Sequence, residues 1–252
     1  CEEEVPFKRL LAGYLDHQAR MIARAPVDVR LGTPVTAELA HAIEPDVLIA
    51  ALGGQPCIPD IPGIESPRVV GAEEAYHQPD RIGGTVVILG GGLVGIELAI
   101  YLAGLGRRVT IMEMMETLSD GGNPVHGLAL SNEIDRYQIE VTTATRAIAV
   151  RKDGVIGEYV GGAYTLPPCP TVQAAVLQSN TFRKSIRSDA EEGSRRVFPA
   201  DTVVYAVGRR ALSEEADALS LCAPEFHRIG DCWLPRNVQQ ATRMAFAVAR
   251  DI

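Results

Sequence analysis

The stretch Thr85-Val-Val-Ile-Leu-Gly90-Gly-Gly92-Leu-Val-Gly95-Ile-Glu97-Leu-Ala99 decides the fold of this chain. An apolar run of strand type leads into a G-x-G-x-x-G turn, and residues 93–105 then read as a helix. In such a turn the first glycine permits the tight bend, the second lets backbone approach a pyrophosphate, and the third lets the helix pack close to the strand. The sequence therefore predicts a dinucleotide-binding βαβ unit, whose cofactor-binding turn also includes Leu93 and Val94.

A second predicted strand follows the helix and ends on an acid. This strand runs from Val109 to Glu113, and Glu113 lies 23 residues after Gly90. An acid about 20 residues after the turn is suited to accept from ribose hydroxyls. Glu113 would repel a 2′-phosphate and no arginine follows it directly, so we favour NADH over NADPH.

Two other interpretations of this region remain open. The glycines could form a tight turn in another doubly wound protein, or bind a different adenosine-containing ligand. Glu113 could be an ordinary solvated strand end.

Composition and charge limit the classes of protein and partner. The chain has 252 residues, of which 46% are hydrophobic, enough for one large or two smaller globular domains. Its formal net charge of −8 argues against nucleic acid as a partner, because phosphate binding favours a basic surface. No apolar run approaches the length of about 18 residues that a membrane span requires.

The cysteines and histidines form no recognisable reactive set. The five cysteines contain no C-x-x-C pair, which argues against a thioredoxin-like redox pair and a local zinc or iron–sulfur site. Their odd number suggests free thiols in a cytoplasmic protein. His77, His126 and His227 are not spaced as a catalytic triad or metal set, so we expect structural or solvated roles. We predict no catalytic side chain and no metal ligand.

Apolar periodicity predicts further elements on both sides of the glycine turn. The predicted helices are 6–24, 36–43, 72–77, 126–137 and 237–250, and the predicted strands are 27–31, 47–51, 69–70, 139–143, 201–208 and 226–231. Runs at 147–151 and 155–160 flank Asp153-Gly154 and indicate a hairpin. Residues 161–200 are the least informative, with a possible strand at 171–177 and a charged, solvated loop at 183–196.

Similar turns before and after the glycine turn extend the pattern. Ala50-Ala51-Leu52-Gly53 and Tyr205-Ala206-Val207-Gly208 each end an apolar strand, and Ile229-Gly230-Asp231 precedes the last helix. This order resembles the two-dinucleotide-domain flavoproteins of the pyridine nucleotide-disulfide oxidoreductase family, in which an NAD(P)H domain is inserted into an FAD domain.

Three further segments narrow the resemblance. Segments 31–36 (LGTPVT), 45–53 (PDVLIAALG) and 56–63 (PCIPDIPG) are most similar to the C-terminal half of old-yellow-enzyme-like NADH:flavin oxidoreductases. That group includes 2,4-dienoyl-CoA reductase, enoate reductases and trimethylamine dehydrogenase. The resemblance implies an α/β fold: a Rossmann-like NAD(P)H-binding domain, with parallel sheet and β-meander, at residues 68–207. This domain is inserted in a partial FAD-binding domain at 1–67 and 208–252.

The resemblance also implies roles for individual residues. Gly90, Gly92 and Gly95 would hold the NADH pyrophosphate, Glu113 the adenosine ribose, and Glu97 would lie on the nicotinamide side. Gly53 and Gly208 would mark turns where connecting segments pass near the cofactors, and Asp231 would contact the ribityl or pyrophosphate region of the flavin. Glu97 could instead be an ordinary helix-face residue, and Asp231 a helix N-cap.

Parts of the family pattern are not found in this chain. No G-x-G-x-x-G precedes Gly53, so the adenosine cradle of the FAD domain is missing, as are the FMN-binding barrel and the four-cysteine motif of a 4Fe-4S cluster. The chain starts Cys-Glu-Glu-Glu without an initiator Met, and we expect a fragment of a longer polypeptide. The first turn has Leu52 where the family usually has threonine.

The resemblance implies a function for the intact enzyme. NADH would pass hydride to FAD, and electrons would continue through an iron–sulfur centre and FMN to an enoate or dienoyl-CoA type substrate. The fragment alone is expected to be inactive. Its partners would be NAD(P)H, flavin and the rest of its own polypeptide, and neither nucleic acid nor a membrane. One alternative is a non-catalytic adenine-nucleotide-binding module of an amine dehydrogenase-like flavoprotein. Another is an FAD-linked disulfide or ferredoxin reductase.

Overall fold

The chain divides into two compact units. The computed structural model describes residues 9–119, 124–161, 181–182 and 191–252. One unit comprises Cys1–Gly54 with Ala211–Ile252, and the other comprises Gln55–Arg210. The strands at their boundary, β2 (Gly54–Pro56) and β13 (Arg209–Ala211), pair with each other. The assignment of these units to FAD and NAD(P)H stays a prediction.

A parallel five-stranded sheet forms the centre of the unit Gln55–Arg210. Its strand order is β3 (Val69–Gly71), β12 (Thr202–Tyr205), β4 (Thr85–Leu89), β5 (Arg108–Met112) and β7 (Glu140–Thr142). All neighbouring strands in it run parallel. The chain adds β5 on one side of β4 and β12 on the other, which is the strand reversal of a doubly wound fold. In such folds a crevice opens beyond the carboxyl ends of the strands at this point.

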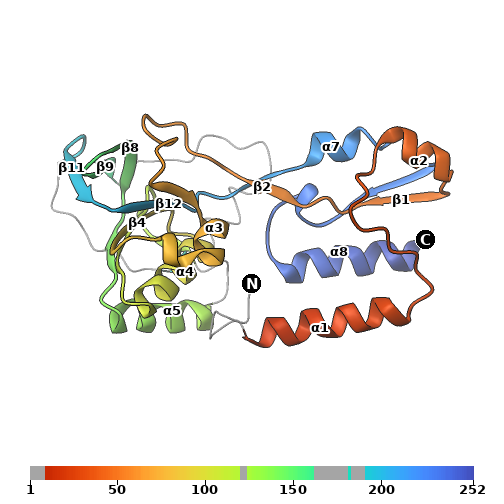
Figure 1. The fold of residues 1–252 in the computed structure, drawn as a ribbon, viewed down its shortest axis with the longest axis horizontal. Coiled ribbons are helices and arrows are strands. Elements are labelled where there is room, and N and C mark those ends of the chain that lie inside the picture. The colour runs from red at the N-terminus through yellow and green to blue at the C-terminus, as the bar shows by residue number, and fades with distance from the viewer. Residues whose placement is uncertain (1–8, 120–123, 162–180, 183–190) are drawn as a thin grey trace. The chain divides into compact units, whose positions relative to one another are not determined.

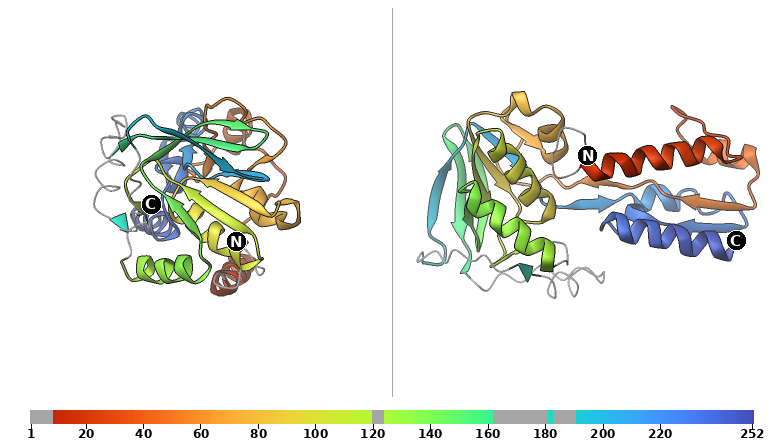
Figure 2. Two further views of the ribbon diagram at one scale, coloured as in Figure 1. Left: turned by 90° about the vertical axis from the view of Figure 1, so that its left-hand side faces the viewer. Right: turned by 90° about the horizontal axis from the view of Figure 1, so that it is seen from below.

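Different layers cover the two faces of this sheet. Helix α4 (Leu93–Gly104) packs on β4 and β5 between α3 (Ala72–His77) and α5 (Pro124–Arg136). The antiparallel sheet of β8 (Thr145–Arg151), β9 (Gly154–Tyr159) and β11 (Arg195–Pro199) lies on the opposite face (Figures 1 and 2). The short 3-10 helix η2 (Pro79–Arg81) follows α3.

Strand β4 is buried on both of its faces. Val87 and Leu89 join a core cluster with Phe198 of the antiparallel sheet. Val86 and Ile88 are fully buried on the opposite face, because successive side chains of a strand alternate. This double burial explains the uninterrupted apolar run of the sequence.

The structure confirms most of the predicted elements of this unit and corrects one. The hairpin at Asp153-Gly154, the helices near 72–77 and 126–137, and the strands near 69–70 and 139–143 are all present. Arg195 and Arg196 begin β11, so the prediction of a loop up to residue 196 is wrong there. The possible strand at 171–177 lies outside the described residues. The sequence did not predict the pairing of β6 (Leu118–Ser119) with β10 (Thr181–Phe182).

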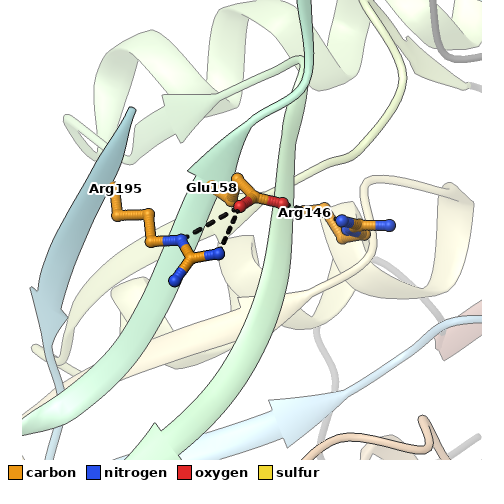
Figure 3. A network of polar contacts seen from close by, with 3 residues as sticks. All are labelled: Arg146, Glu158 and Arg195. Carbon is orange, nitrogen blue, oxygen red and sulfur yellow. Dashed lines mark hydrogen bonds and ion pairs between the residues drawn. The ribbon is translucent and has the colours of Figure 1, made fainter. Parts of the chain in front are cut away.

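A row of charged side chains crosses the antiparallel sheet of β8, β9 and β11 (Figure 3). Arg146 of β8, Glu158 of β9 and Arg195 of β11 occupy paired register positions. The Glu158 carboxylate accepts from Arg146 Nη2 at 2.7 Å and from Arg195 Nε at 3.0 Å. The hydrogen bonds from Arg146 and then Arg195 hold the pKa of the Glu158 carboxyl below its usual value.

We expect Glu158→Gln to lower the free energy of unfolding at neutral pH. Because the folded-state pKa is lowered, the contribution of the carboxylate is fully present above the ordinary glutamate value of about 4.3 and is lost as pH falls through the folded value. Denaturant unfolding of both proteins between pH 7 and pH 3 checks this expectation. A stability difference that did not shrink at acid pH would contradict it. Glu133→Gln is the control, since its contact with Arg136 on the same helix is longer, at 3.4 Å.

The unit Cys1–Gly54 with Ala211–Ile252 contains a parallel pair of strands. β1 (Val47–Ala50) pairs with β14 (Glu225–Arg228). The accompanying helices are α1 (Arg9–Arg24), α2 (Ala37–Ile43), α7 (Ser213–Asp217), the 3-10 helix η4 (Gly230–Cys232) and α8 (Val238–Asp251). These elements confirm the predicted helices near 6–24, 36–43 and 237–250. No helix in the described part of the chain is long and apolar enough to cross a membrane.

One predicted strand of this unit is wrong. Residues 27–31 are not a strand, although Val27, Val29 and Leu31 alternate with polar residues. All three side chains are exposed, and none of the described strands pairs with this segment. Alternation alone does not make a strand, because the backbone groups need a hydrogen-bonded neighbour.

Candidate functional site

Two glycines of the turn between β4 and α4 are required by the packing of the protein itself. Gly90 has a φ of +110°, and a Cβ there would lie 2.5 Å from the carbonyl oxygen of Ala206. A Cβ on Gly95 would lie 2.1 Å from the carbonyl oxygen of Gly90. The turn after β4 thus touches the turn after β12, and α4 packs directly on the turn that precedes it.

Gly92 differs, because nothing in the described residues requires a glycine there. Its φ is −77°, which any residue adopts. Apart from Gly92 and its two chain neighbours, no atom of the described residues lies within 4 Å of the position that a Cβ would take. Gly92 is also the N-cap of α4, and it has no side chain that could accept from the first N–H groups of the helix. As far as the described residues show, the turn therefore leaves space in front of the N-terminus of α4, and a helix N-terminus stabilises an anion.

The two residues after Gly92 begin α4 at this opening. Leu93 is half-buried and Val94 is 51% exposed, whereas every residue from Gly95 to Leu102 is buried. Backbone N–H groups of the first helical turn have no intrahelical acceptor. They can donate to a ligand that occupies the space over Gly92.

Glu113 is tied to the glycine turn and is not a solvated strand end. Its half-buried carboxylate accepts from the N–H of Gly91 at 2.6 Å through Oε2 and from the N–H of Met115 at 2.7 Å through Oε1. A carboxylate has about four acceptor positions, so it can also accept from a ligand. Leu118 packs under Gly91, where a Cβ would lie 2.4 Å from Leu118 Cδ2. No local sequence pattern indicates these partners.

Burial raises the pKa of the Glu113 carboxyl above its usual value. The hydrogen bonds from the backbone N–H groups of Met115, Gly91 and Met114 act in the opposite direction and are outweighed by desolvation. The folded chain therefore holds a proton on Glu113 at pH values where the unfolded chain has released it.

This shift predicts a pH dependence of stability. The free energy of unfolding should decrease as pH rises from the ordinary glutamate value of about 4.3 through the raised folded value. Glu113→Gln should remove this decrease, which for one proton is at most about 1.4 kcal/mol per pH unit. Denaturant unfolding of both proteins from pH 4 to pH 8 measures the difference in slope. Equal slopes would contradict the assignment of the shift to Glu113.

Glu97 lies on the buried side of α4 and not on a solvated helix face. It is 9% exposed and follows Gly95 by two residues. Its Oε1 is 4.0 Å from Nε2 of His126 in the first turn of α5. The predicted role of Glu97 on the nicotinamide side stays a prediction.

Gly53 and Asp231, two predicted cofactor-binding residues of the other unit, lie at the same edge of its sheet. Gly53 follows β1 and has a φ of +80°, and Asp231 follows β14. β1 and β14 are parallel neighbours with Ala50 opposite Arg228, so the residues after both strands lie at the same sheet edge. The thiol of Cys232 donates to the carbonyl oxygen of Ala50 at 3.1 Å and fixes this arrangement.

Asp231 is not the N-cap of the closing helix. Its Oδ1 accepts from the N–H of Arg236 at 3.2 Å, whereas Asn237 caps α8 by accepting from Gln240. Gly208, in the other unit, has a φ of +106°, and its carbonyl oxygen accepts from the N–H of Cys57 at 2.9 Å. The flavin-related roles of Gly53, Gly208 and Asp231 stay predictions.

Metal-ligating residues do not cluster in the described part of the chain. No three His, Cys, Asp or Glu residues among those described are placed to hold a metal ion. Cys57, Cys222 and Cys232 are free thiols.

Comparison with known proteins shows which family the chain resembles. The family model described as pyridine nucleotide-disulphide oxidoreductase matches residues 11–229. A bilirubin reductase of Mediterraneibacter gnavus is 35% identical over 69% of this chain and 27% of its own length. An NADH oxidase of Thermoanaerobacter brockii is 30% identical over 72% of this chain and 29% of its own length. The chain thus spans less than a third of these relatives.

A solved structure shows the same fold along the chain. A 2-naphthoyl-CoA reductase superposes with a TM-score of 0.80 at 24% identity, over 99% of this chain and 33% of that one. This likeness confirms the predicted α/β, Rossmann-like fold.

Proposed function

Because the chain belongs to the pyridine nucleotide-disulphide oxidoreductase family, we propose that it is the NADH- and FAD-binding part of a flavin-dependent oxidoreductase. The unit Gln55–Arg210 takes NADH, and the unit Cys1–Gly54 with Ala211–Ile252 contributes part of the FAD site. Two relatives with the names of a bilirubin reductase and an NADH oxidase support a redox role.

The observation that carries the proposal is the unused space at Gly92. Gly90 and Gly95 are glycines because a Cβ at either position would meet backbone, whereas none of the described residues gives such a reason for Gly92. The space faces the N-terminus of α4, which suits a pyrophosphate. Glu113, bound to the N–H of Gly91, brings a carboxylate to the same turn and suits ribose hydroxyls. These residues fit a dinucleotide.

Each part of the chain has a defined task in this account. The turn Gly90–Gly95 binds the pyrophosphate, Glu113 orients the ribose and disfavours a 2′-phosphate, and Glu97 lies toward the nicotinamide. Gly53 and Asp231 hold the ribityl or pyrophosphate region of the flavin, with Gly208 in the other connecting segment. When bound, NADH supplies a hydride and FAD accepts it. No side chain of this chain is assigned as a catalytic acid or nucleophile.

The whole protein's reaction is part of the same proposal. The rest of the polypeptide provides an iron–sulfur centre and an FMN barrel, and the intact enzyme reduces an enoate or dienoyl-CoA type substrate. The sequence of this chain itself contains no four-cysteine cluster motif.

Calorimetric titration of the 252-residue chain with NADH, NADPH and ADP tests the nucleotide assignment. We expect NADH to bind about tenfold more tightly than NADPH, a difference of about 1.4 kcal/mol, because Glu113 opposes a 2′-phosphate. ADP that bound as tightly as NADH would favour a non-catalytic adenine-nucleotide module of the amine dehydrogenase-like type. Absence of binding by all three would contradict the proposal.

A further inference from the structure

Helix α4 carries one buried carboxylate in an otherwise uncharged helix. Glu97 is the one charged residue among residues 93–104, and every residue from Gly95 to Leu102 is buried. A buried carboxylate is strongly destabilising unless a hydrogen bond or an opposite charge compensates it. The surroundings of Glu97 must therefore supply that compensation.

The neighbouring helix offers a side chain that can carry a positive charge. Helices α4 and α5 lie side by side in both figures of the fold (Figures 1 and 2). His126, in the first turn of α5, places Nε2 4.0 Å from Glu97 Oε1, and its side chain is 38% exposed. Histidine is the side chain that most readily changes charge near neutral pH.

The charge of Glu97 matters for the candidate nucleotide site. Glu97 follows Gly92 by five residues, which is roughly 7.5 Å along a helix with a rise of about 1.5 Å per residue. This separation is shorter than the Debye length of about 10 Å at ordinary ionic strength. A carboxylate at this distance would repel a pyrophosphate at the N-terminus of α4.

We propose that His126 is a positioning residue that acts through Glu97. In its cationic form it pairs with the Glu97 carboxylate and so weakens the repulsion between that carboxylate and a pyrophosphate at the glycine turn. This inference rests on the proposed function, because it assumes that the turn binds a nucleotide diphosphate. His126 thus gains a role in nucleotide binding, whereas the sequence alone predicts a structural or solvated role for it.

Calorimetry with ADP and with adenosine, at pH 6.5 and fixed salt, tests this role. His126→Asn should weaken ADP binding about tenfold, whereas His126→Lys, which keeps a positive charge, should bind ADP within about threefold of wild type. In the background of Glu97→Gln, the His126→Asn substitution should weaken ADP binding less than about twofold, because residue 97 then carries no negative charge for His126 to act on. Adenosine, which has no phosphate, should bind all variants alike.

Controls separate this electrostatic role from a loss of structure. His77→Asn, on α3 of the same unit, should bind ADP as wild type does. Thermal unfolding identifies variants that fold. If His126→Asn does not fold, His126→Gln replaces it in both backgrounds. A merely structural role would weaken adenosine binding too and would not be rescued by lysine.

The outcomes distinguish the inference from the proposed function. If wild type binds neither ADP nor NADH, both the proposed function and the inference that rests on it are contradicted. If wild type binds ADP and His126→Asn binds equally well, the inference alone is overturned. A tenfold loss that persists in the Glu97→Gln background would also overturn it, since His126 would not then act through Glu97.

Discussion

Gly95→Ala should destabilise the unit Gln55–Arg210 by about 3 kcal/mol. The added methyl group would lie 2.1 Å from the carbonyl oxygen of Gly90, which is a backbone atom. No side chain can move away to relieve this contact, so α4 must shift off the end of β4. Urea unfolding followed by circular dichroism measures the loss. NADH binding should fall with it, because the shift displaces the turn.

Gly104→Ala is the matched control for this substitution. Gly104 ends the same helix, and a Cβ there would lie 3.6 Å from Tyr137 Oη, an ordinary van der Waals distance. Alanine is favoured over glycine in helices by up to about 1 kcal/mol, so this variant should be as stable as wild type or slightly more stable. A Gly95→Ala protein as stable as Gly104→Ala would contradict the close packing of α4 on the glycine turn.

Gly92→Val should produce the opposite pattern, with lost binding and retained stability. We expect NADH affinity to fall about 100-fold, equivalent to about 2.8 kcal/mol, because the side chain fills the space assigned to the pyrophosphate. Stability should stay within about 1 kcal/mol of wild type, since valine adopts the φ of −77° and, apart from the chain neighbours, its Cβ meets no described atom within 4 Å.

Calorimetry and urea unfolding on the same preparations check both parts of this expectation. Gly104→Ala again serves as the control and should bind NADH normally. A Gly92→Val protein that bound NADH like wild type would show that the ligand does not approach the turn at Gly92. A Gly92→Val protein that failed to fold would show that the glycine has a structural reason after all.

Local signals were sufficient for the central βαβ unit. The apolar run before Gly90, the spacing of the glycines and the acid at Glu113 correspond to β4, α4 and the end of β5. Such signals are local because neighbouring residues determine the turn and the two periodicities. The same is true of the helix at 72–77 and the hairpin at Asp153-Gly154.

Features that depend on distant partners could not be predicted in this way. The segment 27–31 has strand-like alternation but lacks a paired neighbour among the described residues, whereas Arg195 and Arg196 form a strand because they pair with β9. The insertion of β12 between β3 and β4 is likewise a long-range event. The charged residues at the start of β11 resemble a loop in the sequence, because exposed strand positions need no apolar side chains and so lack the apolar pattern by which a strand is predicted.

The candidate site shows the same division between local and distant information. The residue types of the turn and the acid were predictable, because the chemistry of a dinucleotide demands them. The hydrogen bond from Gly91 to Glu113 and the approach of His126 to Glu97 join segments that are 22 and 29 residues apart. Only the packing of the sheet and its helices reveals these contacts.

The most direct test of the central claim is to locate bound NADH on the chain by NMR. A 15N-labelled sample of the 252-residue chain, with assigned backbone amides, is titrated with NADH. The account predicts the largest chemical-shift changes at residues 90–95 and at Met115, whose N–H groups form the turn or bond to Glu113. Shift changes concentrated elsewhere, with these amides unchanged at saturating NADH, would contradict it.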